Sequence, residues 1–122
     1  MMLVELGKRY RFEAAHRLPH VPHDHKCFRL HGHSFEVEIC VTGEVDPGTG
    51  WLVDFGQVTA VVEPILKAEL DHRTLNDVPG LENPTSEMLC LWLWRRLLPD
   101  LPLLSAVTVH ETCAARCTYR GD

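Results

Sequence analysis

The alternation of apolar and polar side chains over residues 33–42 constrains the fold of this chain more than any other pattern. The apolar positions are Phe35, Val37, Ile39 and Val41, and the polar positions between them are Ser34, Glu36, Glu38 and Thr42. Side chains of a β-strand point alternately to the two faces of a sheet, so this period of two predicts a strand with one buried face. Turn-forming residues at 46–50, Asp-Pro-Gly-Thr-Gly, end the strand.

Further strands are predicted near both ends of the chain. The apolar residues Tyr10, Phe12 and Ala14 alternate with Arg11 and Glu13, which predicts a strand that ends near His16. Residues 17–30 contain two prolines and many polar side chains, and they are predicted to form a loop. Residues 104–111 and 115–120 are predicted to form two closing strands around a short turn.

Two helices are predicted between these pairs of strands. Asp54 opens the first, and apolar side chains recur at helical spacing from residue 55 to residue 70. Because Pro64 lies inside that pattern, we expect it to kink or split the helix. After a loop over residues 71–84, the second helix is expected to begin near Thr85, with Glu87 in its first turn, where the helix dipole favours a carboxylate.

The order of these elements indicates an α+β fold. Paired strands with helices grouped between them predict a four-stranded antiparallel sheet that carries two helices on one face. No repeat, low-complexity segment or linker divides the chain, so we expect residues 1–122 to form a single domain.

Composition excludes some classes of partner. The net charge of -5 argues against broad binding to nucleic acid or to anionic membranes, which requires clustered positive charge. No apolar run is long enough to span a bilayer. The first five residues lack the basic and apolar regions of a signal peptide, and the five cysteines are an odd number. We therefore expect free thiols and a cytoplasmic location.

Three histidines form a candidate zinc site. On an extended backbone, His31 and His33 point to the same side and lie about 6.6 Å apart, so their imidazoles can converge on one ion. His16, at the end of the neighbouring strand, can supply the third nitrogen. Three histidines leave a tetrahedral zinc ion with one open position, which is typical of catalytic sites. A lone His-x-His would more often be an ordinary pair of strand histidines; the third histidine and the nearby cysteine favour the metal site.

The loop between the two strands carries more side chains of interest. Three further histidines, His20, His23 and His25, are alternative ligands or residues at the mouth of the site, and the sequence leaves their roles open. Cys27 follows His25-Lys26 and precedes Arg29. Positive charge nearby lowers the pKa of a thiol, so Cys27 is a candidate metal ligand or base, although it could also be a small apolar loop residue.

Candidate polar residues also occur in the second half of the chain. Asp71 directly precedes His72, and a carboxylate beside an imidazole can fix its tautomer and raise its basicity. This spacing alone is weak evidence, because many such pairs are polar residues at helix ends. Glu111 lies at the end of a predicted strand. If buried, its carboxylate could accept two parallel hydrogen bonds from a guanidine-like group; otherwise it is an exposed strand-end charge.

The motifs around these residues resemble the 6-pyruvoyltetrahydropterin synthase family. The segment Cys27-Phe-Arg-Leu-His31-Gly-His33, preceded by Phe12-Glu-Ala-Ala-His16, carries the resemblance. Further matching segments are Gly50-Trp-Leu-Val-Asp-Phe55, Leu70-Asp-His72, Asn83-Pro-Thr-Ser-Glu87 and Val109-His-Glu-Thr-Cys113. The three residues between the cysteine and His-Gly-His are similar to the bacterial branch that forms a 6-carboxy product. Phe28 departs from the glycine that is usual there.

The resemblance implies a zinc enzyme of queuosine (7-deazaguanine) biosynthesis. Its substrate would be 7,8-dihydroneopterin triphosphate, cleaved to 6-carboxy-5,6,7,8-tetrahydropterin, acetaldehyde and triphosphate. It implies that Zn²⁺ is held by His16, His31 and His33. It also implies that Cys27 accepts a proton, that His72 is the opposing acid–base group with Asp71 and Glu111 in its relay, and that Glu111 anchors the pterin ring.

The resemblance also implies the tunnelling fold, an oligomeric barrel of joined sheets with sites at subunit boundaries. A homo-oligomer, trimeric or hexameric, is therefore expected. Two alternatives remain open at this point. One is 6-pyruvoyltetrahydropterin synthesis, in which triphosphate is eliminated and the side chain is kept. The other is a zinc- or pterin-binding module without catalysis, which Cys27 and the Asp71-His72 pair disfavour because simple binding needs neither.

Overall fold

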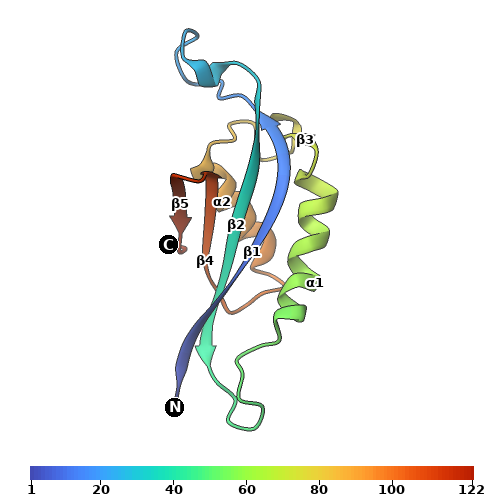
Figure 1. Ribbon diagram of the computed structural model, residues 1–122, viewed down its shortest axis with the longest axis vertical. Coiled ribbons are helices and arrows are strands. Elements are labelled where there is room, and N and C mark those ends of the chain that lie inside the picture. Colours follow the sequence, from blue (N-terminus) through green and yellow to red (C-terminus); the bar gives the residue numbers. More distant parts are fainter.

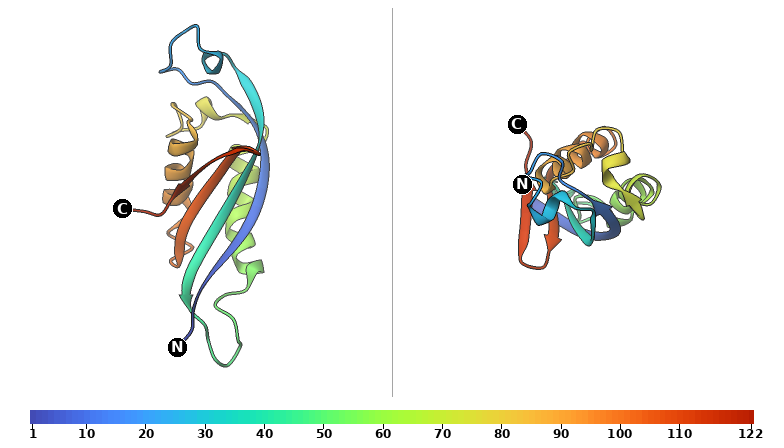
Figure 2. Two further views of the ribbon diagram at one scale, coloured as in Figure 1. Left: turned by 60° about the vertical axis from the view of Figure 1, so that its left-hand side comes forward. Right: turned by 90° about the horizontal axis from the view of Figure 1, so that it is seen from above.

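A computed structural model describes all residues from 1 to 122. The chain folds into two layers, a twisted five-stranded sheet and two helices that cover one of its faces (Figures 1 and 2). The strand order is β3-β1-β2-β4-β5. The α+β class and the helices on one face are confirmed.

The longest strands form an antiparallel pair. Strand β1 (Leu3–His16) and strand β2 (His31–Glu44) are paired along their full length, from Leu3 opposite Glu44 to His16 opposite His31. The loop between them carries the short 3-10 turn η1 (Lys26–Phe28) and extends beyond the end of the sheet (Figure 1). The predicted loop over residues 17–30 therefore has the expected bounds, whereas β1 begins well before the predicted start near Tyr10.

The remaining strands extend the sheet on both sides. Strand β4 (Leu104–Thr112) pairs antiparallel with β2, and β5 (Ala115–Tyr119) pairs antiparallel with β4. Strand β3 (Arg73–Thr74) runs parallel to β1 at the opposite edge. The expectation of four antiparallel strands was therefore wrong: the sheet has five strands and is mixed. Two residues are too few to give a periodic signal, and β3 is held by its hydrogen bonds to β1.

Both predicted helices are present. Helix α1 (Phe55–Ile65) is capped by Asp54, whose side chain accepts the Gly56 N–H, and it passes directly into the π-helical turn η2 (Leu66–Leu70). Pro64 lies near the end of α1, and the helical hydrogen-bonding pattern changes just beyond it, as expected for a residue without an N–H group. A 3-10 turn η3 (Leu75–Asp77) and helix α2 (Ser86–Leu97) follow, and Thr85 caps α2 by accepting the Met88 N–H.

The core lies between the sheet and the helices. Phe12 of β1 is opposite Phe35 of β2, and their rings stack with centroids 5.2 Å apart. The helices contribute fully buried side chains, including Val62, Leu89 and Leu93. This packing fixes which face of β1 and β2 is covered, because a shift of one residue in register would turn every apolar side chain outward. No helix is both long enough and apolar enough to cross a membrane.

Candidate metal centre and active site

Three histidines meet where β1 and β2 end beside the loop. His16 is the cross-strand partner of His31, and His33 lies two residues further along β2, opposite Ala14. The ring centroid of His16 lies 4.7 Å from that of His31 and 5.1 Å from that of His33. All three side chains are on the helix-covered face, because they continue the alternation that buries Phe12 and Phe35. The sequence prediction that these histidines converge is thus confirmed as geometry.

Backbone carbonyls fix the orientation of two of the rings. The Nδ1 atom of His16 lies 2.9 Å from the Pro84 carbonyl oxygen, and Nδ1 of His31 lies 2.7 Å from the Arg29 carbonyl oxygen. A carbonyl only accepts, so each Nδ1 carries the proton and each Nε2 presents a lone pair. Such a hydrogen bond on the far ring nitrogen is the usual arrangement around metal-binding histidines.

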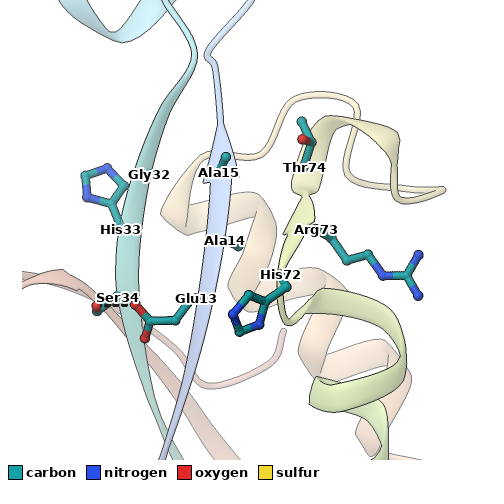
Figure 3. Close-up of a pocket in the computed structure, with 9 residues that line it drawn as sticks. All are labelled: Glu13, Ala14, Ala15, Gly32, His33, Ser34, His72, Arg73 and Thr74. Carbon is teal, nitrogen blue, oxygen red and sulfur yellow. Dashed lines mark hydrogen bonds between the residues drawn. The ribbon is translucent and has the colours of Figure 1, made fainter.

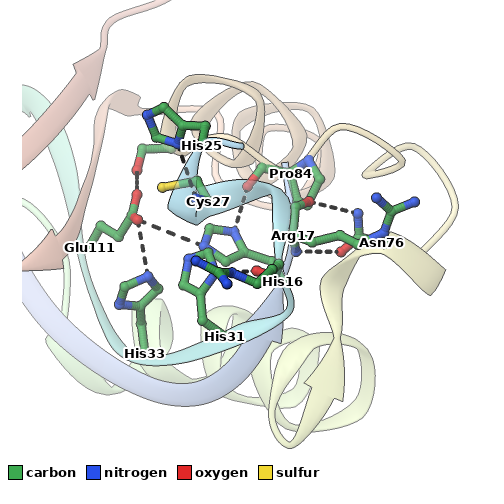
Figure 4. Close-up of polar contacts among 11 residues, drawn as sticks. His16, Arg17, His25, Cys27, His31, His33, Asn76, Pro84 and Glu111 are labelled. Atoms are coloured by element: carbon green, nitrogen blue, oxygen red, sulfur yellow. Dashed lines mark hydrogen bonds and ion pairs between the residues drawn. The ribbon is translucent and has the colours of Figure 1, made fainter. Parts of the chain in front are cut away.

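Glu111 of β4 completes a four-residue cluster (Figure 4). Its Oε1 atom lies 3.1 Å from Nε2 of His33 and 3.7 Å from Nε2 of His16. The hydroxyl of Ser86, at the start of α2, donates to Oε2 of Glu111 at 2.7 Å. One ligand atom from each of His16, His31, His33 and Glu111 lies within 4.8 Å of the others.

Burial favours the neutral form of two of these histidines, His16 and His33. The pKa of His16 and that of His33 are both lowered, chiefly because burial disfavours the charged imidazolium, although the Glu111 carboxylate opposes this. Their Nε2 atoms are buried, and the contacts to Glu111 do not have the geometry of hydrogen bonds. Buried lone pairs without a donor are costly unless a cation occupies the centre. The cluster therefore fits a divalent metal ion with nitrogen and oxygen ligands.

Cys27 lies in the η1 turn of the loop, close in the chain to the cluster (Figure 4). Its backbone carbonyl accepts the N–H of Leu18, two residues beyond His16. Its own N–H donates to Nδ1 of His25 at 3.0 Å. The thiol is half-buried and forms no disulfide; the other four cysteines are free as well. The loop thus holds Cys27 by both of its backbone polar groups.

Asp71 and His72 form a hydrogen-bonded pair, as predicted. Nδ1 of His72 lies 2.9 Å from Oδ2 of Asp71, and Oδ1 of the same carboxylate accepts the Glu13 N–H at 2.9 Å. These hydrogen bonds, the one from Glu13 first, lower the pKa of Asp71. The His72 backbone has φ of 58°, in the left-handed region that non-glycine residues adopt uncommonly, although asparagine, aspartate and histidine do so more often than the others. The exposed His72 imidazole lies toward Glu13, on the face of the sheet without helices (Figure 3).

Within one chain, His72 lies on one face of the sheet, and the cluster of three histidines and Glu111 lies on the other. His72 lines a cavity of about 480 Å³ together with Glu13 and Ser34, whose side chains are on the face without helices (Figure 3). His33 borders this cavity, but its side chain is directed to the other face, where it meets Glu111. Strand β1 separates His33 from His72 (Figure 3). The fold therefore brings together the histidines, Glu111 and the Cys27 loop but leaves the Asp71-His72 pair apart.

Some groups at the cluster were not foreseen from the sequence. The resemblance placed Glu111 in the site as an anchor for the pterin ring, but its direct contacts with His16 and His33 were not predicted, because they depend on the position of β4 beside β2. Ser86 and the Pro84 carbonyl were missed as well, although both lie in the matching segment Asn83–Glu87. The match of that segment to the family was the one sign in the sequence that it contributes to the site. The segment leads into α2, and it orients the His16 imidazole and the Glu111 carboxylate.

Sequence comparisons identify relatives of this chain. A family model described as 6-pyruvoyl tetrahydropterin synthase matches residues 5–122. A Synechocystis protein named 6-carboxy-5,6,7,8-tetrahydropterin synthase is 43% identical over 117 residues, covering 92% of this chain and 89% of that protein. Human 6-pyruvoyl tetrahydrobiopterin synthase is 30% identical, covering 97% and 92%.

A solved structure supports the same assignment. The 6-pyruvoyl tetrahydropterin synthase of Caenorhabditis elegans superposes with a TM-score of 0.89 at 29% identity, over 100% of this chain and 98% of that one. The sequence match and the fold agree along essentially the whole chain. The chain therefore belongs to the 6-pyruvoyl tetrahydropterin synthase family.

Proposed function

We propose that this chain is a zinc-dependent carbon–carbon lyase. It converts 7,8-dihydroneopterin triphosphate to 6-carboxy-5,6,7,8-tetrahydropterin, acetaldehyde and triphosphate, in the cytoplasmic pathway to queuosine. The observation that carries the proposal is the cluster of His16, His31 and His33, with two buried Nε2 atoms that have no hydrogen-bond partner. The name of the Synechocystis relative, at 43% identity, supports the choice of reaction.

The donor set suits zinc. Imidazole nitrogens and a carboxylate oxygen are ligands that Zn²⁺ commonly takes, and His16, His31 and His33 are the residues that would hold it. When bound there, the ion would act as a Lewis acid on the oxygens of the substrate side chain.

Separate side chains would then transfer protons and bind the pterin ring. Cys27, as thiolate, takes a proton from one side of the substrate side chain. His72, held by Asp71, exchanges protons from the opposite side. Glu111 accepts hydrogen bonds from the guanidine-like edge of the pterin and so fixes the side chain near the histidines.

These roles require more than one copy of the chain. His72 faces away from the cluster within its own chain, so a second copy must supply the His72 that acts beside Cys27. The sheet also has open edges: β3 covers only Ala14 and Ala15 of β1, and β5 has no partner on its outer side. Exposed strand edges favour pairing with another chain. A trimer or hexamer with joined sheets meets both requirements.

A second reaction is the alternative to the lyase. In 6-pyruvoyltetrahydropterin synthesis, triphosphate is eliminated and the carbon side chain is retained. The human and Caenorhabditis elegans relatives bear names of this type, and they share the fold. The spacing of three residues between Cys27 and His31 favours the lyase for this chain.

Product analysis separates the two reactions. The purified zinc-loaded protein is incubated with 7,8-dihydroneopterin triphosphate, and the carbon products are identified by mass spectrometry. Release of acetaldehyde together with a 6-carboxypterin is the expected result. Loss of triphosphate without acetaldehyde would replace the lyase with the alternative, and failure to consume the substrate would remove both.

A further inference from the structure

The turn that carries Cys27 is fixed by side chains of its own loop. A three-residue 3-10 turn is too short to be stable alone, and η1 lies in a loop that extends beyond the sheet. At its start, Nδ1 of His25 accepts the Cys27 N–H at 3.0 Å (Figure 4). The backbone N–H of Phe28 also returns to the His25 carbonyl oxygen at 3.0 Å. His25 therefore holds the turn through both its ring and its backbone.

A stack of side chains holds the other end of the turn. The Phe28 ring lies against the His23 ring, with centroids 4.2 Å apart and planes at 29°. The guanidinium carbon of Arg17 lies 5.2 Å from the centroid of the same ring. Through Arg17, the first residue after His16, Phe28 ties the turn to the end of β1.

We propose that His25 is a positioning residue for Cys27 and acts as a hydrogen-bond acceptor through Nδ1. This rests on the proposed function, in which Cys27 is the proton acceptor. His25 accepts the backbone N–H of the residue that carries the thiol. Without that acceptor, the start of η1 loses its side-chain cap, and the thiol is distributed over more loop conformations. Small displacements of a catalytic group cost rate more than they cost substrate binding.

Three variants of the zinc-loaded protein test the acceptor role. His25→Ala removes the acceptor. His25→Asn replaces the ring with an amide oxygen that can accept the N–H two residues on, as asparagine does in turns. His20→Ala is the matched control, because His20 is an exposed histidine of the same loop. For each variant, kcat, KM, zinc content and the rate of Cys27 alkylation by iodoacetamide are measured, the last by mass spectrometry of the Cys27 peptide.

We expect His25→Ala to lower kcat about five- to tenfold, the factor by which losing one capping hydrogen bond typically shifts a folding equilibrium, with KM and zinc content unchanged. His25→Asn should restore kcat to within about twofold of wild type, and His20→Ala should behave as wild type. A His25→Asn variant as slow as His25→Ala would overturn the proposal, because the imidazole itself would then be required. Wild-type kcat in His25→Ala would overturn it too.

The rate of Cys27 alkylation tests the role of His25 independently of the proposed reaction. If the wild type consumes no pterin, the proposed function fails, but the reactivity of Cys27 still reports the geometry of the turn. An altered Cys27 alkylation rate in His25→Ala that His25→Asn restores supports positioning by His25 in either case. Equal rates in all three variants and the wild type contradict it.

Discussion

His16 lies directly opposite His31 in the antiparallel ladder, with ring centroids 4.7 Å apart. Each Nδ1 is engaged by a backbone carbonyl, and each Nε2 is turned to the shared centre. The orientation of both rings is therefore set by the polypeptide before any metal binds. Binding needs little rearrangement of these two side chains, which makes the cluster a suitable target for direct tests.

Metal content should depend on the three histidines. We expect the wild type to bind about one zinc ion per chain, and His31→Ala to lose nearly all of it, because two imidazoles and a partly exposed carboxylate remain. His20→Ala, which changes an exposed histidine of the loop, should retain full occupancy. Elemental analysis after dialysis against a weak chelator measures this. Full zinc content in His31→Ala would refute the ligand assignment.

The stability of the metal-free protein should fall as pH is lowered. Burial holds the pKa of His16 and that of His33 below the ordinary value of 6.5. Between 6.5 and the lowered values, the unfolded chain binds protons that the folded chain does not, so the free energy of unfolding decreases as pH falls through this range. Urea unfolding at several pH values measures the slope. His16→Gln should show a shallower slope, and equal slopes would contradict the assignment to His16.

Glu111→Gln distinguishes an anchor for the substrate from a metal ligand. Three imidazoles remain, so we expect zinc to be retained, whereas loss of the charge-assisted hydrogen bonds should raise KM about 10- to 100-fold. Ser86→Ala leaves the carboxylate and removes only its hydroxyl donor, so its effect should be smaller. If Glu111→Gln loses zinc as completely as His31→Ala, then Glu111 is a ligand that the site cannot lack.

Two inactive variants should restore activity to each other if the site spans two chains. Cys27→Ala should keep zinc and lose about 10²- to 10⁴-fold in rate, and His72→Asn should be similarly slow. Asparagine is preferred to alanine at position 72, because it tolerates the left-handed backbone found there. After joint unfolding and refolding, about one quarter of the sites would contain both native residues.

The comparison for this experiment is a mixture without refolding. Activity that appears only after the subunits are exchanged supports a site shared between chains. Absence of any recovery, or a monomer by light scattering at micromolar concentration, would place Cys27 and His72 in separate roles. Wild-type acetaldehyde production by Cys27→Ala alone would show that Cys27 is not the base.

Much of the site could be predicted because its ligands follow local periodicity. His31 and His33 continue the alternation that buries Phe35, so the sequence determines the face on which they lie. The partnership of His16 with His31 follows once the two strands pair as a hairpin with matched apolar faces. Asp71 and His72 are neighbours in the chain, and their contact required no knowledge of the tertiary structure.

The rest depends on contacts between segments distant in the sequence. Glu111 reaches the histidines because β4 pairs beside β2, and an isolated glutamate at a strand end gives no sign of this. Pro84 contributes through its carbonyl, which every residue possesses. The resemblance implied that His72 opposes Cys27 in a site at a subunit boundary, and the place of His72 within one chain depends on its left-handed backbone and on the pairing of β3 with β1.

The pairing of His16 with His31 closes the ladder at its loop end, and this has a consequence for local unfolding. In a hairpin, the paired residues next to a long loop open most readily, because no further pairing beyond them holds the two strands together. A metal ion shared by residues of both strands would fasten this end of the hairpin. Amide hydrogens around Ala15 and Gly32 should then exchange with solvent slowly in the loaded protein and faster after chelation, while those near Val37 remain unaffected. Amide hydrogen exchange rates at the loop end of this hairpin would thus report metal occupancy.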